Sequence, residues 1–217
     1  MPMDRDQARI RPYRPADLDA LYRICLLTAD NGRDATGLYR DPRLPGHVYA
    51  APYGLFEPAL AFVVQDAAGV GGYIVGALDS QDFGRRLERD WWPRLRRRYP
   101  DPPAGAPSGQ WTADQRLAYR IHHPFGTPAE LAGRYPSHLH INLVARLQAG
   151  GHGRRLIETL LGALRRQGSG GVHLYVNPGN QRAAGFYRHL GFAQLPVADA
   201  QVFGMQLEPA PPSPGAG

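Results

Sequence analysis

The stretch "RLQAGGHGRRL", residues 146–156, places three glycines within four positions, just before a segment with helical periodicity. The apolar segment "SHLHINLVA", 137–145, precedes it, and the amphipathic segment "GRRLIETLLGALRRQG", 153–168, follows. Glycines at the start of a helix permit positive φ angles and leave N–H groups uncovered, where the helix dipole favours an anion. A tight strand-to-helix turn with nothing bound would use the same glycines. The cluster alone therefore leaves both interpretations open.

Two familiar phosphate-binding motifs do not fit this stretch. A Walker loop requires a lysine, and all 25 basic residues of the chain are arginines. A Rossmann fingerprint that begins at Gly151 and Gly153 would need its third glycine where Leu156 stands. A third pattern does fit, because Gln148, Gly151 and Gly153 spell Q-x-x-G-x-G.

A second motif lies downstream in "NPGNQRAAGFYRHLGF", residues 177–192. From Asn180 to Phe192 it reads N-x-x-A-x-x-F-Y-x-x-L-G-F. The two motifs together resemble the GNAT acetyltransferases, whose glycine loop holds acetyl-coenzyme A. The resemblance extends over most of the chain, from Ile10 to Leu207.

Three further segments carry a closer resemblance: "YRICLLTADNGRDATGLY" (22–39), "GGYIVGALDS" (71–80) and "WWPRLRRRYP" (91–100). They are similar to the acetyltransferase-like domain at the C-terminal end of O-GlcNAcases and to its free-standing bacterial relatives. The glycosidase part is absent from this chain, whereas the glycine loop is intact.

The pattern of elements and the resemblance together predict the fold class. We expect an α/β GNAT fold with a mixed, mostly antiparallel central sheet, splayed parallel strands 4 and 5, and helices on both faces. The expected strands are 8–15, 59–66, 71–80, 137–145, 171–177 and 200–207. The expected helices are 16–30, 83–100 with an interruption at Pro93, 111–123 with Thr112 as N-cap, 153–168 and 180–192.

The domain organisation follows from the same pass along the chain. We expect one domain over residues 1–207, with a helical or loop insertion at about 81–137. The segment 31–46 is predicted to be loop, and 101–109 a flexible loop. The Pro/Gly-rich tail, 208–217, is expected to be disordered.

The resemblance implies an acetyl-coenzyme A-dependent N-acetyltransferase that transfers acetyl directly from the thioester to an amine. The alternative is a module that binds coenzyme A without catalysing transfer. Backbone groups of the strand before the loop would hold the pantetheine arm, and the loop N–H groups would hold the pyrophosphate. Arg154 or Arg155 would add a charged hydrogen bond. The expected cofactor-binding residues are Leu143, Val144, Gln148, Ala149, Gly150, Gly151, His152, Gly153, Arg154, Asn177, Asn180, Ala183, Phe186 and Tyr187.

Acid–base chemistry requires a group that protonates the leaving thiolate and a group that accepts the amine proton. The motif assigns the acid to Tyr187, although an aromatic packed beside Phe186 would look the same in sequence. His138, His140 and Asn142 share one strand face, and His140 is the candidate base. A surface histidine is the competing interpretation. No third ligand follows the histidine pair at a recognised spacing, so no metal site is expected.

The acceptor is expected to be an amine-bearing small molecule or a protein lysine. Asp30, Asp34, Asp79 and Asn142 are candidate substrate residues, although turn and helix-end chemistry would explain the carboxylates equally well. Trp91 and Trp92 would either line an acceptor site or anchor the insertion. Cys25 lies on the buried face of a predicted helix and is expected to be a core thiol.

Charge and hydropathy exclude several classes of protein. The net charge is +6, but the arginines are scattered without a zinc-finger or RNP pattern, so nucleic-acid binding is not expected. No apolar run approaches the roughly 20 residues that span a bilayer. The N-terminus carries acidic residues and lacks an apolar core, so it does not resemble a secretory signal, and one cysteine excludes a disulfide within the chain. A bacterial, cytoplasmic protein of unknown oligomeric state is therefore expected.

Overall fold

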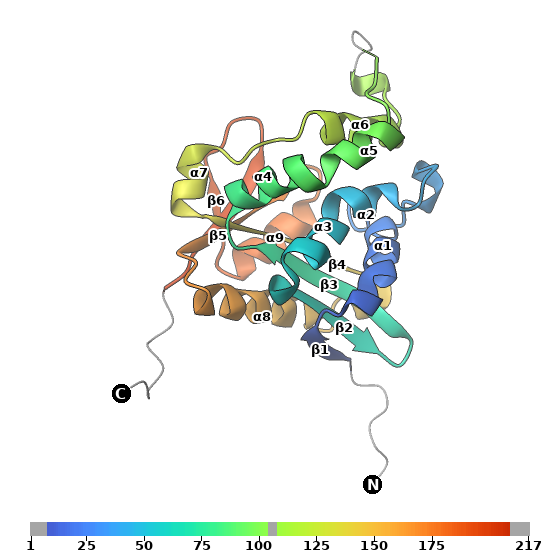
Figure 1. Cartoon of the computed structure of the whole chain (residues 1–217). Coiled ribbons are helices and arrows are strands. Elements are labelled where there is room, and N and C mark those ends of the chain that lie inside the picture. The colour runs from blue at the N-terminus through green and yellow to red at the C-terminus, as the bar shows by residue number, and fades with distance from the viewer. Residues whose placement is uncertain (1–7, 104–107, 209–217) are drawn as a thin grey trace.

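A seven-stranded sheet, in the order β1-β2-β3-β4-β5-β7-β6, forms the centre of the computed structural model, which describes residues 8–103 and 108–208 (Figure 1). Every neighbouring pair is antiparallel except β4 and β5, which run parallel. The mixed sheet expected from sequence is thereby confirmed. The strands are β1 Arg9–Pro12, β2 Ala61–Asp66, β3 Gly69–Ala77, β4 Ser137–Leu143, β5 Gly171–Val176, β6 Ala193–Leu195 and β7 Gln201–Gln206.

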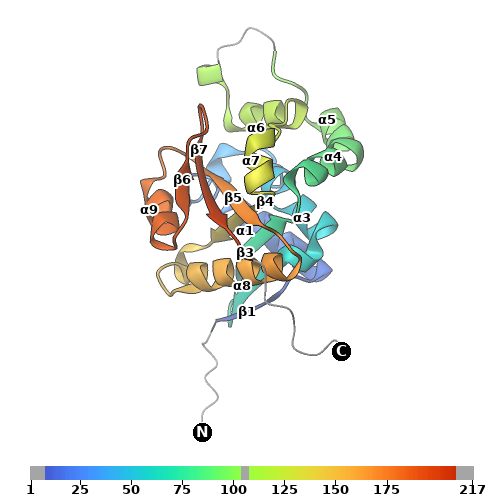
Figure 2. The same cartoon turned by 90° about the vertical axis from the view of Figure 1, so that its left-hand side faces the viewer.

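Helices cover both faces of the sheet. Helix α8 packs against β2, β3 and β4 on one face, while α1 and α3 pack against β3 on the other (Figures 1 and 2). The helices are α1 Leu18–Leu26, α2 Leu44–Tyr49, α3 Ala51–Phe56, α4 Ser80–Asp90, α5 Trp92–Arg98, α6 Ala113–His122, α7 Ala129–Arg134, α8 His152–Arg166 and α9 Gln181–His189.

Strict alternation along the strands separates two hydrophobic cores. Ile74 of β3 and Leu139 of β4 join the Leu156 face of α8, whereas Tyr73 and Val75 point to the layer of α1 and α3. The fully apolar strand β3 is buried on both sides because helices cover it on both sides. The two faces of β4 therefore lead to different environments.

Several sequence predictions are corrected by these bounds. The segment 31–46 is not wholly loop, because α2 begins at Leu44 with Pro45 in its first turn, and α3 follows at once. Helix α7 and the short strand β6 were not predicted. The central strand ends at Ala77 rather than at residue 80, since Asp79 is already the N-cap of α4. The predicted disordered tail lies outside the described residues, apart from Glu208, as do residues 104–107 of the predicted flexible loop.

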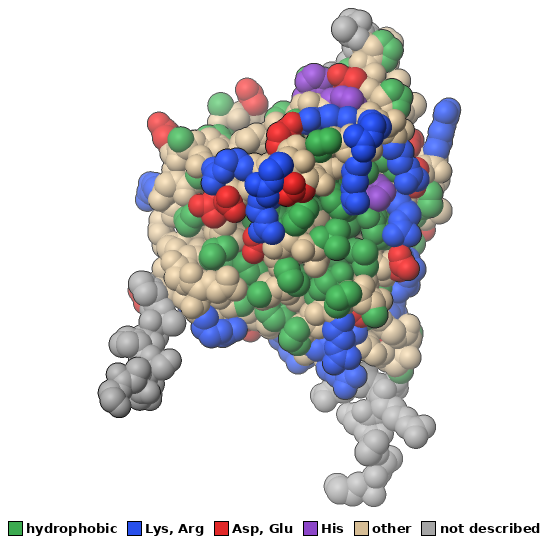
Figure 3. Space-filling view, viewed as in Figure 1, with side chains coloured by type: hydrophobic (Ala, Val, Ile, Leu, Met, Phe, Trp, Pro, Cys, Tyr) green, Lys and Arg blue, Asp and Glu red, His purple; other side chains and the backbone are tan. Residues whose placement is uncertain are grey.

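The insertion between β3 and β4 consists largely of helices. Helices α5 and α6 pack together at the upper end of the molecule in both views (Figures 1 and 2). As predicted, Thr112 caps α6, and its hydroxyl accepts the Gln115 N–H at 3.2 Å in a capping box. On the face seen in Figure 3, the arginines along α4 and α5 are interspersed with carboxylates, above an apolar area over α1–α3. Within the described ranges no helix is long and apolar enough to cross a membrane.

Candidate active site

Strands β4 and β5 pair only at their first residues. The parallel register joins Ser137 to Val172 and His138 to His173, and it stops there. The other edge of β4 stays paired with β3 from His138 to Leu143. The two parallel strands therefore separate toward their carboxyl ends, and the β4 edge that faces β5 is left without a strand partner beyond His138. This is the splay that the sequence predicted.

The glycine loop begins where β4 ends and runs directly into α8. Ala149 has φ 63° and Gly151 has φ 75°, and Gly151 is the N-cap of α8. Among the hydrogen bonds of the described residues, none is donated by the backbone N–H groups of residues 149–154. Six successive N–H groups without acceptors, at the positive end of a 15-residue helix, favour an anion. The arrangement fits a pyrophosphate.

The individual glycines have different roles. A Cβ at Gly151 would meet nothing within 4 Å, so this residue keeps the loop open and supplies the left-handed turn. A Cβ at Gly153 would lie 3.3 Å from the Phe186 ring, so this residue allows α9 to approach the start of α8. At Gly150 a Cβ would lie 2.9 Å from His152 Nε2. The His152 Nδ1 atom is buried without a partner among the described residues.

Gln148 ties the loop to both sides of the splay. Its Nε2 donates to the Leu143 carbonyl oxygen at 2.8 Å, and its Oε1 accepts from Arg182 Nη2 at 2.8 Å. The Val144 N–H donates to the Gly71 carbonyl oxygen at 2.9 Å, on the β3 side. The Val144 N–H is thus already used by β3, whereas the Leu143 carbonyl oxygen is held by a side chain that a ligand can displace.

The remaining expected cofactor residues lie around this loop. Asn180 caps α9 through its side chain, which accepts the Ala183 N–H at 3.1 Å. Asn177 accepts the Gly179 N–H at 2.9 Å and so shapes the turn between β5 and α9. Arg154 is exposed and paired with Glu158 at 2.7 Å, one helical turn along α8. Both asparagines therefore position α9, and Arg154 is partly neutralised.

Tyr187 lies in the buried face of α9. Its ring contacts Phe186, Phe192 and Phe203, with centroids 5.3–6.0 Å away. Burial raises the pKa of the phenol above its usual value, so it stays protonated at neutral pH. Among the described residues its hydroxyl has no hydrogen-bond partner. A protonated phenol with a free hydroxyl is suited to donate a proton.

His140 lies on the face of β4 opposite Leu139. Its ring stacks on Tyr49, with ring centroids 5.4 Å apart. Desolvation lowers its pKa to about 4, so the ring is neutral at pH 7. The Asn142 amide nitrogen lies 3.2 Å from His140 Nε2 and donates to the Tyr73 hydroxyl at 2.9 Å. An amide nitrogen only donates, so His140 Nε2 is the acceptor and carries the lone pair. This atom is therefore able to take up a proton.

His138 is a structural residue instead. Ser80 donates its hydroxyl hydrogen to the Pro136 carbonyl oxygen at 2.7 Å, so His138 Nδ1 must donate to Ser80 Oγ, which is 2.8 Å away. Its Nε2 then accepts from the Tyr53 hydroxyl at 2.8 Å. Burial lowers the pKa of His138 to about 3. The imidazole is fully used and neutral.

The acidic substrate candidates have local partners. Asp30 pairs with Arg33 at 2.9 Å, Asp34 accepts the N–H and hydroxyl of Thr36, and Asp79 caps α4 by accepting the Asp82 N–H. The turn that holds Asp30 approaches the first turn of α9, since a Cβ at Gly32 would lie 3.8 Å from Arg182.

The other candidates from sequence belong to the core. Trp91 and Trp92 are both buried, and Trp91 Nε1 donates to the His47 carbonyl oxygen at 2.9 Å, which anchors the insertion to α2. Cys25 is buried as predicted, and desolvation raises the pKa of its thiol to about 12. Within the described part of the chain, no group of three or more His, Cys, Asp or Glu residues is placed to hold a metal.

The acetyltransferase (GNAT) family model matches residues 128–192, which hold β4, the glycine loop, α8, β5 and α9. The crystal structure of SsHAT is 38% identical in sequence, with a TM-score of 0.85, over 93% of this chain and 99% of that one. The chain belongs to the GNAT acetyltransferase family.

More distant relatives agree with this assignment. The protein O-GlcNAcase of Rattus norvegicus is 26% identical over 191 residues, which are 86% of this chain. The chain spans about 20% of the length of that relative. A phosphinothricin acetyltransferase of Sinorhizobium meliloti, in complex with AcCoA, shares the fold with a TM-score of 0.54 at 14% identity. The similarity to the O-GlcNAcases expected from sequence is thereby confirmed.

Two residues of this GNAT site were missed from sequence. Arg182 stands inside the second motif, between Asn180 and Ala183, yet its contact with Gln148 joins residues 34 positions apart. Tyr49 lies between the predicted loop 31–46 and the predicted strand 59–66, where no element was predicted, and only the folded chain places its ring on His140. The signal for Arg182 was that a basic residue stands in the first turn of a motif helix. Sequence alone does not show which partner such a side chain contacts.

Proposed function

We propose that this GNAT protein is an acetyl-coenzyme A-dependent N-acetyltransferase that acts on an amine. The observation that carries the proposal is the row of six free N–H groups at residues 149–154, placed where β4 and β5 separate. A pyrophosphate fits the N–H row, and an extended arm fits the open edge of β4. A relative of the same fold is in complex with AcCoA, which supports the same cofactor here.

Different residues around the splay would bind different parts of this cofactor. The loop N–H groups would bind the pyrophosphate, with Arg182 as a nearby positive charge. The Leu143 carbonyl oxygen would accept from an amide of the pantetheine arm once Gln148 releases it. When bound, acetyl-coenzyme A supplies an activated acetyl group as a thioester.

Proton transfer is assigned to two residues. His140 Nε2 takes the proton of the amine, directly or through one water, after it gives up the hydrogen bond from Asn142. Its pKa of about 4 keeps it unprotonated at neutral pH, although it makes the imidazole a weak base. Tyr187 donates its phenolic proton to the departing thiolate. The acceptor amine itself must be deprotonated to react, so the pKa of the amine determines how the rate falls as the pH decreases.

Two measurements test the proposal. Acetyl-coenzyme A should raise the melting temperature, since a ligand at a hundredfold excess over its dissociation constant stabilises by about 2.7 kcal/mol. A panel of amines, followed by release of free thiol, should then identify an acceptor. A folded protein whose melting temperature does not change at millimolar ligand would contradict cofactor binding.

The alternative is coenzyme A binding without transfer. It is favoured by β4 itself, which carries no carboxylate in "SHLHINL" to serve as a stronger base than His140. A saturable melting shift together with no thiol release from any amine, above the rate of a loop variant, would select this alternative.

A further inference from the structure

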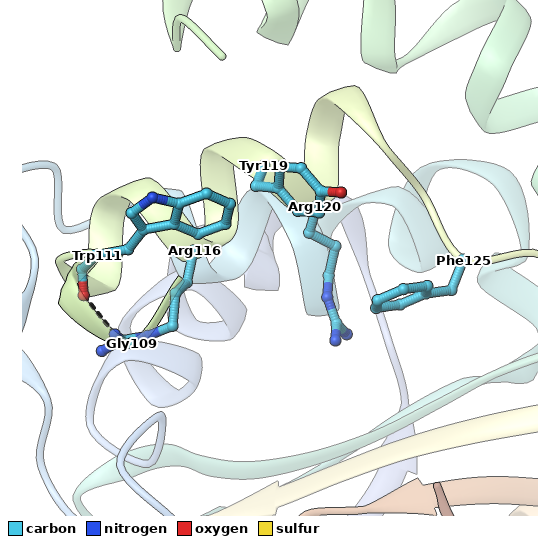
Figure 4. Close-up of a pocket in the computed structure, with 6 residues that line it drawn as sticks. All are labelled: Gly109, Trp111, Arg116, Tyr119, Arg120 and Phe125. Atoms are coloured by element: carbon cyan, nitrogen blue, oxygen red, sulfur yellow. Dashed lines mark hydrogen bonds between the residues drawn. The ribbon is translucent and has the colours of Figure 1, made fainter. Parts of the chain in front are cut away.

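The insertion forms an open pocket at the upper end of the molecule. It has a volume of about 440 Å³ and is lined by Gly109, Trp111, Arg116, Tyr119, Arg120 and Phe125 (Figure 4). All but Gly109, Trp111 and Phe125 come from α6. The motifs of the GNAT family lie elsewhere in the chain, so neither motif accounts for this pocket.

The pocket combines flat apolar walls with positive charge. The Trp111 and Tyr119 rings lie 4.9 Å apart, and Phe125 is 75% exposed. Arg116 and Arg120 stand one helical turn apart and point to the same side of α6 (Figure 4). An exposed phenylalanine beside two guanidinium groups is an unusual surface for a chain to leave uncovered.

Neither guanidinium is neutralised. In the described part of the chain, no carboxylate lies within ion-pair distance of Arg116 or Arg120. Arg116 donates to the Trp111 carbonyl oxygen. The nearby Asp114 accepts the Arg40 N–H at 3.2 Å, and Asp101 lies 2.8 Å from His123. Most other arginines of the insertion, such as Arg96 with Glu88, do have acidic partners.

One aromatic ring, that of Tyr49, lies between a pocket residue and the candidate base. The Arg120 guanidinium lies 4.9 Å from the Phe125 ring centroid and 5.7 Å from that of Tyr49. Tyr49 in turn stacks on His140 at 5.4 Å. Arg120 and His140 therefore both contact the Tyr49 ring, and an acceptor that bridges the two would span that ring.

We infer that this pocket binds the far end of the acceptor, and that the acceptor carries an anionic oxygen group, a carboxylate or a phosphate, several bonds from its amine. This inference rests on the proposed function. A guanidinium fork matches the oxygens of such a group, and the aromatic walls accommodate a flat apolar body between anion and amine. Arg120, next to Tyr49, and Arg116 hold the anion.

The test compares acceptors that differ only in charge. Para-(aminoethyl)benzoate and O-phosphotyramine carry the anion, while para-(aminoethyl)benzamide and tyramine are the matched probes without it. Binding of each is measured by calorimetry with and without coenzyme A, and acetylation by thiol release. We expect at least one anionic probe to bind about tenfold more tightly than its neutral partner, the scale of a hydrogen bond to a charged group. The anionic probe that binds more tightly shows whether the acceptor's anionic group is a carboxylate or a phosphate.

Variants locate the effect. Arg120→Gln and Arg116→Gln should each reduce the preference for the anionic probe and leave binding of the neutral probe unchanged, while Arg120→Lys should restore part of it. Arg166→Gln, at the far end of α8, removes the same charge and should have no effect. A merely structural role of Arg120 would weaken both probes equally.

Equal binding of anionic and neutral probes, or a preference that survives in both glutamine variants, would overturn the inference even if the protein acetylates amines. Binding of single-stranded oligonucleotide at this pocket without preference between the probes would overturn it as well. Failure of coenzyme A to bind would instead count against the proposed function, because the preference for an anion is measured without cofactor too.

Discussion

Arg182 of α9 donates to Gln148 Oε1 at 2.8 Å, and Gln148 donates to the Leu143 carbonyl oxygen at the same distance. Three segments are thereby joined at the mouth of the splay: the end of β4, the glycine loop and the first turn of α9. The two sequence motifs of the family meet at this contact. A charged group from the second motif thus holds the glutamine side chain of the first motif.

Arg182→Met tests this contact. The change keeps most of the side-chain stem and removes the donor, so the loop loses its tie to α9 and a nearby positive charge. We expect affinity for acetyl-coenzyme A to fall about tenfold, the scale of a charged hydrogen bond, with less than about 1 kcal/mol lost in unfolding free energy because Arg182 is exposed. Calorimetric titration and urea unfolding measure the two quantities.

Arg188→Met is the matched control. Arg188 is exposed on the same helix and donates to Gln194 Oε1 at 2.8 Å, away from the loop. If the two variants weaken cofactor binding equally, Arg182 acts through the helix and not through Gln148.

Gly151→Val tests the loop. Nothing lies within 4 Å of the added Cβ, so the cost comes from φ 75°, which a branched side chain disfavours. We expect cofactor binding to be lost at concentrations that saturate the wild type, because valine changes the backbone conformation of the loop and occupies space beside its N–H groups.

Gly168→Val separates binding from strain. Gly168 has φ 79° and equally open space, but it lies at the other end of α8. Both variants should lose similar unfolding free energy, and only Gly151→Val should lose the cofactor. Unchanged binding in Gly151→Val would show that the loop is a structural turn without a role in cofactor binding.

The part of the fold that sequence predicted best is the part where local patterns are unambiguous. The loop, α8, β5 and α9 combine glycines, caps and helical periodicity, and their bounds differ from the prediction by a few residues. The helices α2 and α3 were missed because Pro45, Gly46 and Gly54 resemble turn residues. Gly46 in fact lets α2 approach Tyr22, since a Cβ there would lie 2.3 Å from the ring. Tertiary packing decides such positions.

The candidate site likewise has features that local sequence predicts and features that only the fold determines. The loop residues carry their chemistry in the backbone, which a motif reveals. The contacts of His140 with Tyr49, and of Gln148 with Arg182, join residues far apart in the chain. The direction of a side chain toward a distant partner follows from the fold and not from spacing. The acidic candidates show the reverse case, because their partners lie within three residues.

Tyr187→Phe tests the acid. It keeps the ring that packs on Phe192 and Phe203 and removes only the hydroxyl. We expect little change in cofactor affinity and a fall of about a hundredfold in turnover, because the proton is needed only as charge develops on sulfur. Steady-state kinetics with a working acceptor measure this. Equal turnover, with chemistry shown to be rate-limiting, would assign the proton to another donor.

Four histidines with lowered pKa values make stability depend on pH. Burial lowers the pKa of His138 to about 3, the pKa values of His47 and His140 to about 4, and the pKa of His173 below its usual value, whereas an unfolded histidine titrates near 6.5. Above about pH 6.5 both states are neutral and stability is complete. As pH falls, the unfolded chain takes up protons first, so each histidine should cost about 1.4 kcal/mol per pH unit until its folded pKa is reached.

Urea unfolding at intervals from pH 7.5 to 4.5 measures this slope, and His138→Gln should reduce it. A wild type whose unfolding free energy does not change over this range would show that these rings take up protons in the folded state as readily as in the unfolded chain.

Backbone amide NMR during a titration with acetyl-coenzyme A tests the central claim most directly, because the claim concerns six N–H groups. We predict saturable shifts at one ligand per chain, largest for residues 149–154, with Gly168→Val behaving as the wild type and Gly151→Val showing none. Binding that leaves the amides of residues 149–154 unchanged, or no binding by the folded protein at millimolar ligand, would contradict the account.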